Sequence, residues 1–165
     1  MRAAALIPLF PAACGTAHAQ PPLSAGTTVD RLLVDKSDRV LIGYAQGREV
    51  VRYTNIRFGD APIGHKRFEG DERTPEGDYR ISGRNPNSRY HLSLRISYPN
   101  AADRAYAKAR GRSPGGDIFI HGQPNGRPGL PIARDWTDGC IALSNAEIKQ
   151  LWDRVPDGTP ITIRP

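Results

Sequence analysis

Several patterns are missing from this chain of 165 residues, and each absence narrows its class. No apolar stretch approaches the ~18–20 residues that a membrane-spanning helix needs. No internal repeat and no second composition regime is found, so the length fits one domain with a real core. No run of Lys and Arg with interleaved aromatic residues is present, which argues against a nucleic-acid partner.

Glycine and proline, in contrast, are abundant, with 17 and 15 residues. This composition favours many turns and short strands over long helices. Strands are predicted at 31–35, 39–44, 49–54, 79–82, 90–98, 117–121 and 160–164, the first two forming a hairpin. Helices are predicted at 103–110 and from Ser144 to Val155, where Ser144 and Glu147 have capping-box spacing. The sequence therefore predicts one mostly-β domain with short helices.

The first 19 residues have the pattern of a secretory signal peptide. A positive start is followed by a short apolar stretch and by A-x-A ending at Ala19. We expect cleavage there, a linker over 20–28, a folded domain over 29–165, and export to the periplasm or cell envelope. Lipidation at Cys14 stays an alternative, although the residues before it make a poor lipoprotein cleavage site.

The formal net charge is +6, and it falls to about +5 if Arg2 leaves with the signal. A basic surface favours anionic partners such as anionic lipid or an anionic cell-wall polymer.

Cysteine is scarce, with two residues, and loss of Cys14 would leave Cys140 without an internal partner. An odd cysteine in an oxidising compartment is a liability unless the thiol is used. A small buried hydrophobe is the competing interpretation, because free cysteine is often buried.

His121 closes an apolar strand, and Cys140 follows nineteen residues later, after a loop. Both side chains are therefore expected at one rim of a sheet. A neighbouring imidazole can accept the thiol proton, and the carbonyl of Gly122 could orient the imidazole. The N–H groups of Gly139 and Cys140 could stabilise an oxyanion, since glycine permits close backbone approach to a substrate. These residues predict a Cys/His acyl-transfer enzyme.

A resemblance to a known family rests on these residues and on longer motifs. The order I-H-G (120–122), fifteen residues from Gly122 to Trp136, and T-D-G-C (137–140) resembles the signature of the L,D-transpeptidase catalytic domain (YkuD-type). The segments E-G-D-E-R-T-P-E-G-D-Y, Y-H-L-S-L-R-I-S-Y-P-N and S-P-G-G-D-I-F-I-H-G are similar to its YafK-like branch. The resemblance covers roughly residues 30–165.

The resemblance implies a β-sandwich domain with short helices, no metal and no organic cofactor. Cys140 would be the nucleophile on a peptidoglycan stem peptide, forming a thioester and releasing D-alanine. His121 would be general base and then general acid, and Gly122 would orient it. Gly139 would serve the oxyanion hole. An amine of a second stem would then give a 3-3 cross-link.

Two positions depart from the family pattern. Many members carry His before the Gly-Cys pair and Arg or Asn two residues after the cysteine, where this chain has Asp138 and Ala142. A guanidinium could hold a substrate carboxylate, which Ala142 cannot. Three other arginines are candidates to supply that guanidinium: Arg73, Arg89 and Arg134. The acceptor also stays open, because water in place of an amine would make the protein a hydrolase.

Other residues carry weaker expectations. Tyr90 and His91, at the start of the predicted strand 90–98, and Thr137 in the motif are expected to contact substrate. The tryptophans Trp136 and Trp152 are expected in the core, and His65 is expected to be solvated.

Three other classes of protein are alternatives to this interpretation. A zinc peptidase would need H-x-H or H-E-x-x-H spacing, and neither is present. Papain-like cysteine peptidases place Cys before His in the chain, the reverse of the order here. A non-catalytic module that binds the cell wall remains open.

Overall fold

The structure is a computed structural model that describes residues 26–127 and 131–165. The predicted signal peptide lies outside the described residues, as do Cys14 and most of the predicted linker. The strands are β1 (Arg31–Asp35), β2 (Val40–Ala45), β3 (Arg48–Thr54), β4 (Gly77–Asn85), β5 (Ser93–Ile96), β6 (Phe119–His121), β7 (Ile141–Ala142) and β8 (Pro160–Arg164). The helices are α1 (Ala101–Lys108) and α2 (Asn145–Arg154). The prediction of a mostly-β fold with short helices is confirmed.

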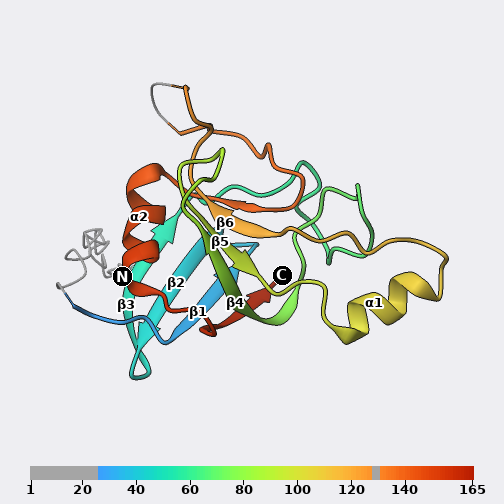
Figure 1. The fold of residues 1–165 in the computed structure, drawn as a ribbon, viewed down its shortest axis with the longest axis horizontal. Helices are drawn as coiled ribbons and strands as arrows, with labels where there is room; N and C mark the ends of the chain where they lie inside the picture. The colour runs from blue at the N-terminus through green and yellow to red at the C-terminus, as the bar shows by residue number, and fades with distance from the viewer. Residues whose placement is uncertain (1–25, 128–130) are drawn as a thin grey trace, which may run out of the picture.

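One curled sheet contains all eight strands, in the order β3-β2-β1-β8-β4-β5-β6-β7. The long strand β4 belongs to both halves of the sheet, pairing with β8 on one side and with β5 on the other. A register shift between Ile81 and Gly83 interrupts its pairing with β5. The halves enclose one core, in which Leu32 and Ile161 of one half share a cluster with Leu94 and Ile120 of the other. Figure 1 shows β5 and β6 crossing over β1 and β2.

The predicted hairpin is confirmed, with β1 and β2 antiparallel. Asp35 closes its turn, because its Oδ1 accepts hydrogen bonds from the Asp38 N–H and the Ser37 hydroxyl. The last strand, β8, pairs in parallel with β1 and antiparallel with β4. Strand β8 therefore joins the hairpin at the start of the chain to the half of the sheet that carries β6 and β7.

Helix α2 begins as its capping box predicts. Ser144 Oγ accepts a hydrogen bond from the Glu147 N–H, and the Glu147 carboxylate accepts one from the Ser144 N–H. Ile148, Leu151 and Val155 are buried, and α2 packs against β5 and β6. The helix therefore buttresses the strand that ends at His121, whereas α1 lies at the far end of the molecule (Figure 1). No helix in the described part of the chain has the length and apolarity to cross a membrane.

Strand β5 begins at Ser93, so the prediction that Tyr90 and His91 start a strand is wrong. His91 has a φ of +68°, outside the β region, and its N–H donates to Asn125 Oδ1 rather than to a strand neighbour. The two residues lie in the loop that precedes the strand.

His65 is not solvated, which corrects the expectation. Its Nδ1 accepts a hydrogen bond from the Glu76 N–H at 2.8 Å, and its Nε2 lies 3.1 Å from Asp103 Oδ1. Tyr79 donates its hydroxyl proton to the other oxygen of Asp103. The segment between β3 and β4 is thus attached to α1 and β4 through a partly buried polar network.

Candidate active site

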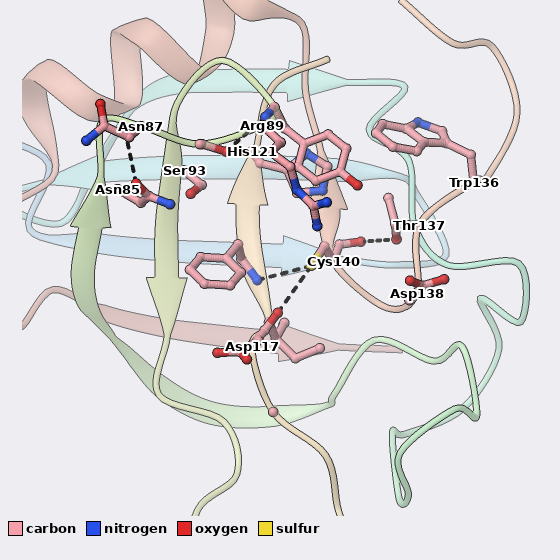
Figure 2. A pocket seen from close by; sticks show the side chains of 15 residues that line it. Asn85, Asn87, Arg89, Ser93, Asp117, His121, Trp136, Thr137, Asp138 and Cys140 are labelled. Atoms are coloured by element: carbon pink, nitrogen blue, oxygen red, sulfur yellow. Dashed lines mark hydrogen bonds between the residues drawn. The ribbon is translucent and has the colours of Figure 1, made fainter. Parts of the chain in front are cut away.

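The parallel pairing of β6 with β7 brings His121 and Cys140 to one edge of the sheet. Ile120 lies opposite Ile141 and His121 opposite Ala142, so Cys140 directly precedes the strand that flanks the histidine. Strand β7 was not predicted, because its two residues are too few for a periodicity signal. Both side chains line one pocket of about 610 Å³, seen in Figure 2.

The imidazole of His121 is held in one tautomer by the chain itself. Its Nδ1 lies 2.7 Å from the carbonyl oxygen of Gly122, and a carbonyl only accepts hydrogen bonds, so Nδ1 carries the proton. The Nε2 lone pair is therefore available as a base. His121 is 3% exposed, and this burial lowers its pKa, with the Gly122 hydrogen bond opposing the shift. The ring is neutral at pH 7.

Two aromatic rings flank this imidazole. Tyr90 lies over it with ring centroids 4.6 Å apart, and Trp136 meets it edge-on at 5.4 Å. Trp136 lines the pocket, so the expectation that it belongs to the core is wrong. Trp152 does pack against the core, as expected. These ring contacts restrict the orientation of the imidazole plane.

Asn125 fastens the loop that carries Tyr90. Its Oδ1 accepts the His91 N–H, its Nδ2 donates to Ser88 O, and its own N–H donates to Arg89 O. Sequence reasoning missed Asn125, because an asparagine in a Gly/Pro-rich loop carries no local signal of a partner more than thirty residues away. His91 is held by this contact and does not line the pocket, whereas Tyr90 does.

Gly122 lies where the chain has no room for a side chain. Its N–H donates to the carbonyls of Tyr90 and Leu92, at 3.0 and 3.3 Å. A Cβ on Gly122 would come 2.5 Å from Asn145 Oδ1. The glycine therefore lets the loop before β5 lie against the end of β6, next to the carbonyl that holds His121.

The Cys140 thiol is partly buried and is not in a disulfide. The Phe119 N–H donates to Sγ at 3.4 Å, and the thiol donates a hydrogen bond to the Asp117 carbonyl oxygen at 3.5 Å (Figure 2). Burial raises the pKa of the Cys140 thiol to about 11, with the Phe119 hydrogen bond opposing the shift. The resting pair is thus a neutral thiol and a neutral imidazole.

Gly139 lies where the protein's own backbone requires a glycine. Its φ is +118°, and a Cβ would come 2.4 Å from the carbonyl oxygen of Arg73. Thr74 Oγ1 donates to the Gly139 carbonyl at 2.9 Å. The segment before β4 therefore packs directly beneath the cysteine turn, and only glycine fits there.

Thr137 closes the same turn. Its hydroxyl donates to the Cys140 carbonyl at 2.8 Å and accepts from the Gly139 N–H at 3.2 Å. Thr137 is 6% exposed, so its hydroxyl positions the turn and has little capacity left for a substrate. The Gly139 N–H is therefore already engaged within the turn.

The three candidate arginines separate in space. Arg89 lines the pocket, and Figure 2 shows its side chain extending toward Cys140. The Arg73 guanidinium lies over Gly64, and Arg134 is exposed and outside the pocket lining. Ala142 is paired with Arg57, each donating its N–H to the carbonyl of the other.

Metal binding finds no support within the described ranges, because no three His, Cys, Asp or Glu side chains cluster there.

The protein is thus a mostly-β domain with a Cys/His pocket. Its curled sheet carries a thiol outside any disulfide and an oriented imidazole at the β6–β7 edge. The family model for the L,D-transpeptidase catalytic domain (YkuD) matches residues 29–163. The chain belongs to this family.

Individual relatives agree with that assignment. YafK of Escherichia coli (strain K12) is 32% identical over 95 residues, which cover 56% of this chain and 32% of YafK. The helical cell shape determining protein Pgp2 from Campylobacter jejuni is 30% identical with a TM-score of 0.65, covering 84% of this chain and 48% of Pgp2. An Enterococcus faecium L,D-transpeptidase, at 15% identity and a TM-score of 0.53, shares the fold over 84% of this chain and 50% of its own. This chain therefore spans about a third of YafK over the matched region and about half of the solved relatives.

Proposed function

We propose that the chain is a peptidoglycan L,D-transpeptidase that works through a Cys140 thioester. The observation that carries the proposal is the Gly122 carbonyl on His121 Nδ1, which leaves Nε2 as a base in the pocket that Cys140 lines. Family membership supports the substrate class, a peptidoglycan stem peptide.

The first half-reaction follows from the protonation states. Cys140 Sγ attacks the carbonyl carbon of the bond between diaminopimelate and D-alanine, while His121 Nε2 takes the thiol proton. The Cys140 N–H donates to the oxyanion that forms. The tetrahedral intermediate collapses, the C–N bond breaks, and the imidazolium gives its proton to the leaving D-alanine amine. The product is a thioester between Cys140 and the shortened stem.

The second half-reaction reverses these proton transfers. A side-chain amine of another stem attacks the thioester carbonyl, and His121 Nε2 accepts the amine proton. The carbon–sulfur bond breaks, and the thiolate recovers its proton from the imidazolium. A 3-3 cross-link results. If water replaces the amine, the same steps give a hydrolase that trims stems or detaches groups from diaminopimelate.

The acceptor is the part of the proposal that Ala142 leaves open. Many family members have a polar side chain two residues after the cysteine, and Ala142 is a buried methyl group here. This departure supports a hydrolase as the second candidate function.

Purified chain from residue 20 onward, incubated with diaminopimelate-type sacculi, tests both functions. Muropeptides are released by digestion and identified by mass spectrometry, with Cys140→Ala as control. We expect tripeptide-containing 3-3 dimers that the variant does not form. Shortened stems without new dimers would identify water as the acceptor. Binding to sacculi with no turnover by either protein would instead identify a non-catalytic module.

We also propose that the protein is exported to the periplasm or cell envelope, where stem peptides are found. The signal-like first 19 residues support this location. Pgp2 is described as a determinant of helical cell shape, and a role in cell shape is the corresponding proposal for this chain. A fusion of residues 1–28 to a reporter that is active only outside the cytoplasm tests export, and a silent reporter would contradict it.

A further inference from the structure

The pocket around Cys140 holds two charged side chains of opposite sign that have no partner among the described residues. Among the described residues that line it, Arg89 is the one Lys or Arg, and Asp117 and Asp138 are the carboxylates. Asp117 is paired with Arg95 at 2.8 Å. Within the described part of the chain, the Arg89 guanidinium and the Asp138 carboxylate make no hydrogen bond or ion pair.

The two groups reach the pocket from different walls. Arg89 lies in the loop between β4 and β5, and its backbone is fixed because its carbonyl accepts the Asn125 N–H at 2.9 Å. Asp138 lies in the cysteine turn, between Thr137, whose hydroxyl closes the turn, and Gly139. Figure 2 shows Arg89 and Asp138 on separate sides of Cys140. The backbones of Arg89 and Asp138 are therefore anchored in two separate segments, whereas both side chains are exposed.

Asp138 is close enough to the thiol to influence it. Its negative charge raises the pKa of Cys140, as a lesser cause beside burial. A cation bound by Asp138 would therefore lie within electrostatic reach of the sulfur. Arg89, in turn, lies in the same loop as Tyr90, whose ring covers the general base.

We propose that Arg89 and Asp138 together bind a zwitterionic α-amino acid group, the free end of a diamino-acid side chain in the donor peptide. The guanidinium takes the α-carboxylate through two parallel hydrogen bonds, and the Asp138 carboxylate takes the α-ammonium. This rests on the proposed function, because it assigns the specificity of the same pocket. It also assigns the missing arginine of the family pattern to Arg89 and gives a role to Asp138, where many members have His.

Binding is measured apart from chemistry in the Cys140→Ala protein. Calorimetry is run with a stem tetrapeptide in three forms: unmodified, amidated at the side-chain carboxylate, and acetylated at the side-chain amine. In the otherwise unchanged pocket we expect each modification to weaken binding about tenfold, because each removes one charge-assisted contact in a partly exposed site. Arg134→Gln is the matched control, an exposed arginine near the cysteine in sequence and outside the pocket lining.

The pattern across variants identifies each contact. Arg89→Gln should lower the affinity for the unmodified peptide about tenfold. This variant should then bind the unmodified and the amidated peptides equally, while the acetylated peptide should still bind more weakly than the unmodified one. Asp138→Asn should show the reverse pattern, and Arg89→Lys should restore part of the affinity. The same variants with Cys140 intact should show the effects in KM more than in kcat, because the contacts are made in the ground state.

The outcomes separate this proposal from the proposed function. Turnover by the Cys140-containing protein, with no discrimination among the three peptides in calorimetry or in kcat/KM, would overturn the zwitterion assignment and leave the thioester mechanism intact. Discrimination that persists in both Arg89→Gln and Asp138→Asn would also overturn it. Absence of both binding and turnover with every peptide would remove the proposed function and this inference together.

Discussion

The chemistry of the site is set by the resting protonation of two residues. Burial raises the pKa of Cys140 to about 11 and lowers that of His121, so neither group is charged near pH 7. A thiolate–imidazolium pair is therefore not the ground state of the free enzyme. In the proposed mechanism the histidine acts as a general base during attack, and this requirement would give the activity a defined pH dependence.

The first prediction concerns that pH dependence. Because His121 must be neutral, kcat/KM should rise with pH through an apparent pKa below 6.5, the ordinary value for histidine. It should then stay level until the thiol ionises near its pKa of about 11. The ultraviolet absorbance of the thiolate, titrated in wild type against Cys140→Ala, should appear only in the alkaline range. A thiolate signal at neutral pH would refute the neutral pair.

A second residue-scale prediction separates backbone strain from steric overlap in the cysteine turn. Gly139→Ala places a Cβ 2.4 Å from the Arg73 carbonyl at a φ of +118°, whereas Gly158→Ala has a φ of +89° and open space. Gly158→Ala should cost about 1 kcal/mol from φ alone, and Gly139→Ala about 2–4 kcal/mol with a large loss of activity. Urea unfolding and kcat/KM measure both, and equal losses of stability in the two variants would contradict the overlap.

Short elements with many partners position the site. Strand β7 has two residues, yet it pairs with β6 and with Arg57, so Cys140 is held by long-range pairing on both sides. The loop before β5 has no regular structure, and Asn125 supplies the hydrogen bonds that a strand neighbour would otherwise give.

The third prediction tests that asparagine. Asn125→Ala removes the side-chain bonds to His91 N–H and Ser88 O, which should cost about 1–2 kcal/mol of stability. The loop then releases Tyr90 from His121, so kcat should fall about tenfold or more. Ser144→Ala is the stability-matched control, because loss of the α2 cap costs about 1 kcal/mol without touching the pocket. If both variants keep wild-type kcat, Asn125 does not position the site.

At the scale of the whole molecule, buried polar side chains connect the cysteine turn to distant elements. The segment between β3 and β4 supplies Arg73 and Thr74 to Gly139. The same segment is tied down by Lys36, whose Nζ donates to Gly64 O and pairs with Glu76, and by His65 on Asp103. Stability and site geometry therefore depend on the same network.

The fourth prediction is a loss of stability in mild acid. Burial, helped by the charge of Arg67 and opposed by Asp103, lowers the pKa of His65 below 6.5, and His121 is lowered as well. The unfolded chain therefore takes up these protons first. The stabilisation is complete above pH 6.5 and is lost as pH falls through the lower, folded-state pKa values.

Protonated His65 would also present an N–H to the Glu76 N–H, where it now accepts. Urea unfolding at pH 7.5 and 5.5 measures the loss in wild type and in His65→Asn, whose side chain can still accept that bond. The variant should lose less stability between the two pH values, the remainder coming from His121. Protonation of carboxylates lowers stability only at stronger acidity, because the pKa values of the three carboxylates concerned lie below 3.8. These are Asp35, Asp71 and Asp135. An identical loss in both proteins would exclude His65 as its source.

The sequence by itself determined what local patterns encode. Alternation and turn residues gave the β1–β2 hairpin, the Ser144 capping box gave the start of α2, and the spacing of His121 to Cys140 identified the family. Each of these signals lies within a few residues of the feature it specifies, or within one continuous motif.

Only the tertiary structure decided the rest, because burial and pairing join residues far apart in the chain. It showed a neutral thiol, since desolvation depends on everything packed around Cys140. It placed the Arg73 carbonyl against Gly139, and it showed that Arg89 lines the pocket whereas Arg134 does not. No periodicity or spacing reports these distances, because they arise when a curled sheet brings its separate edges around one core.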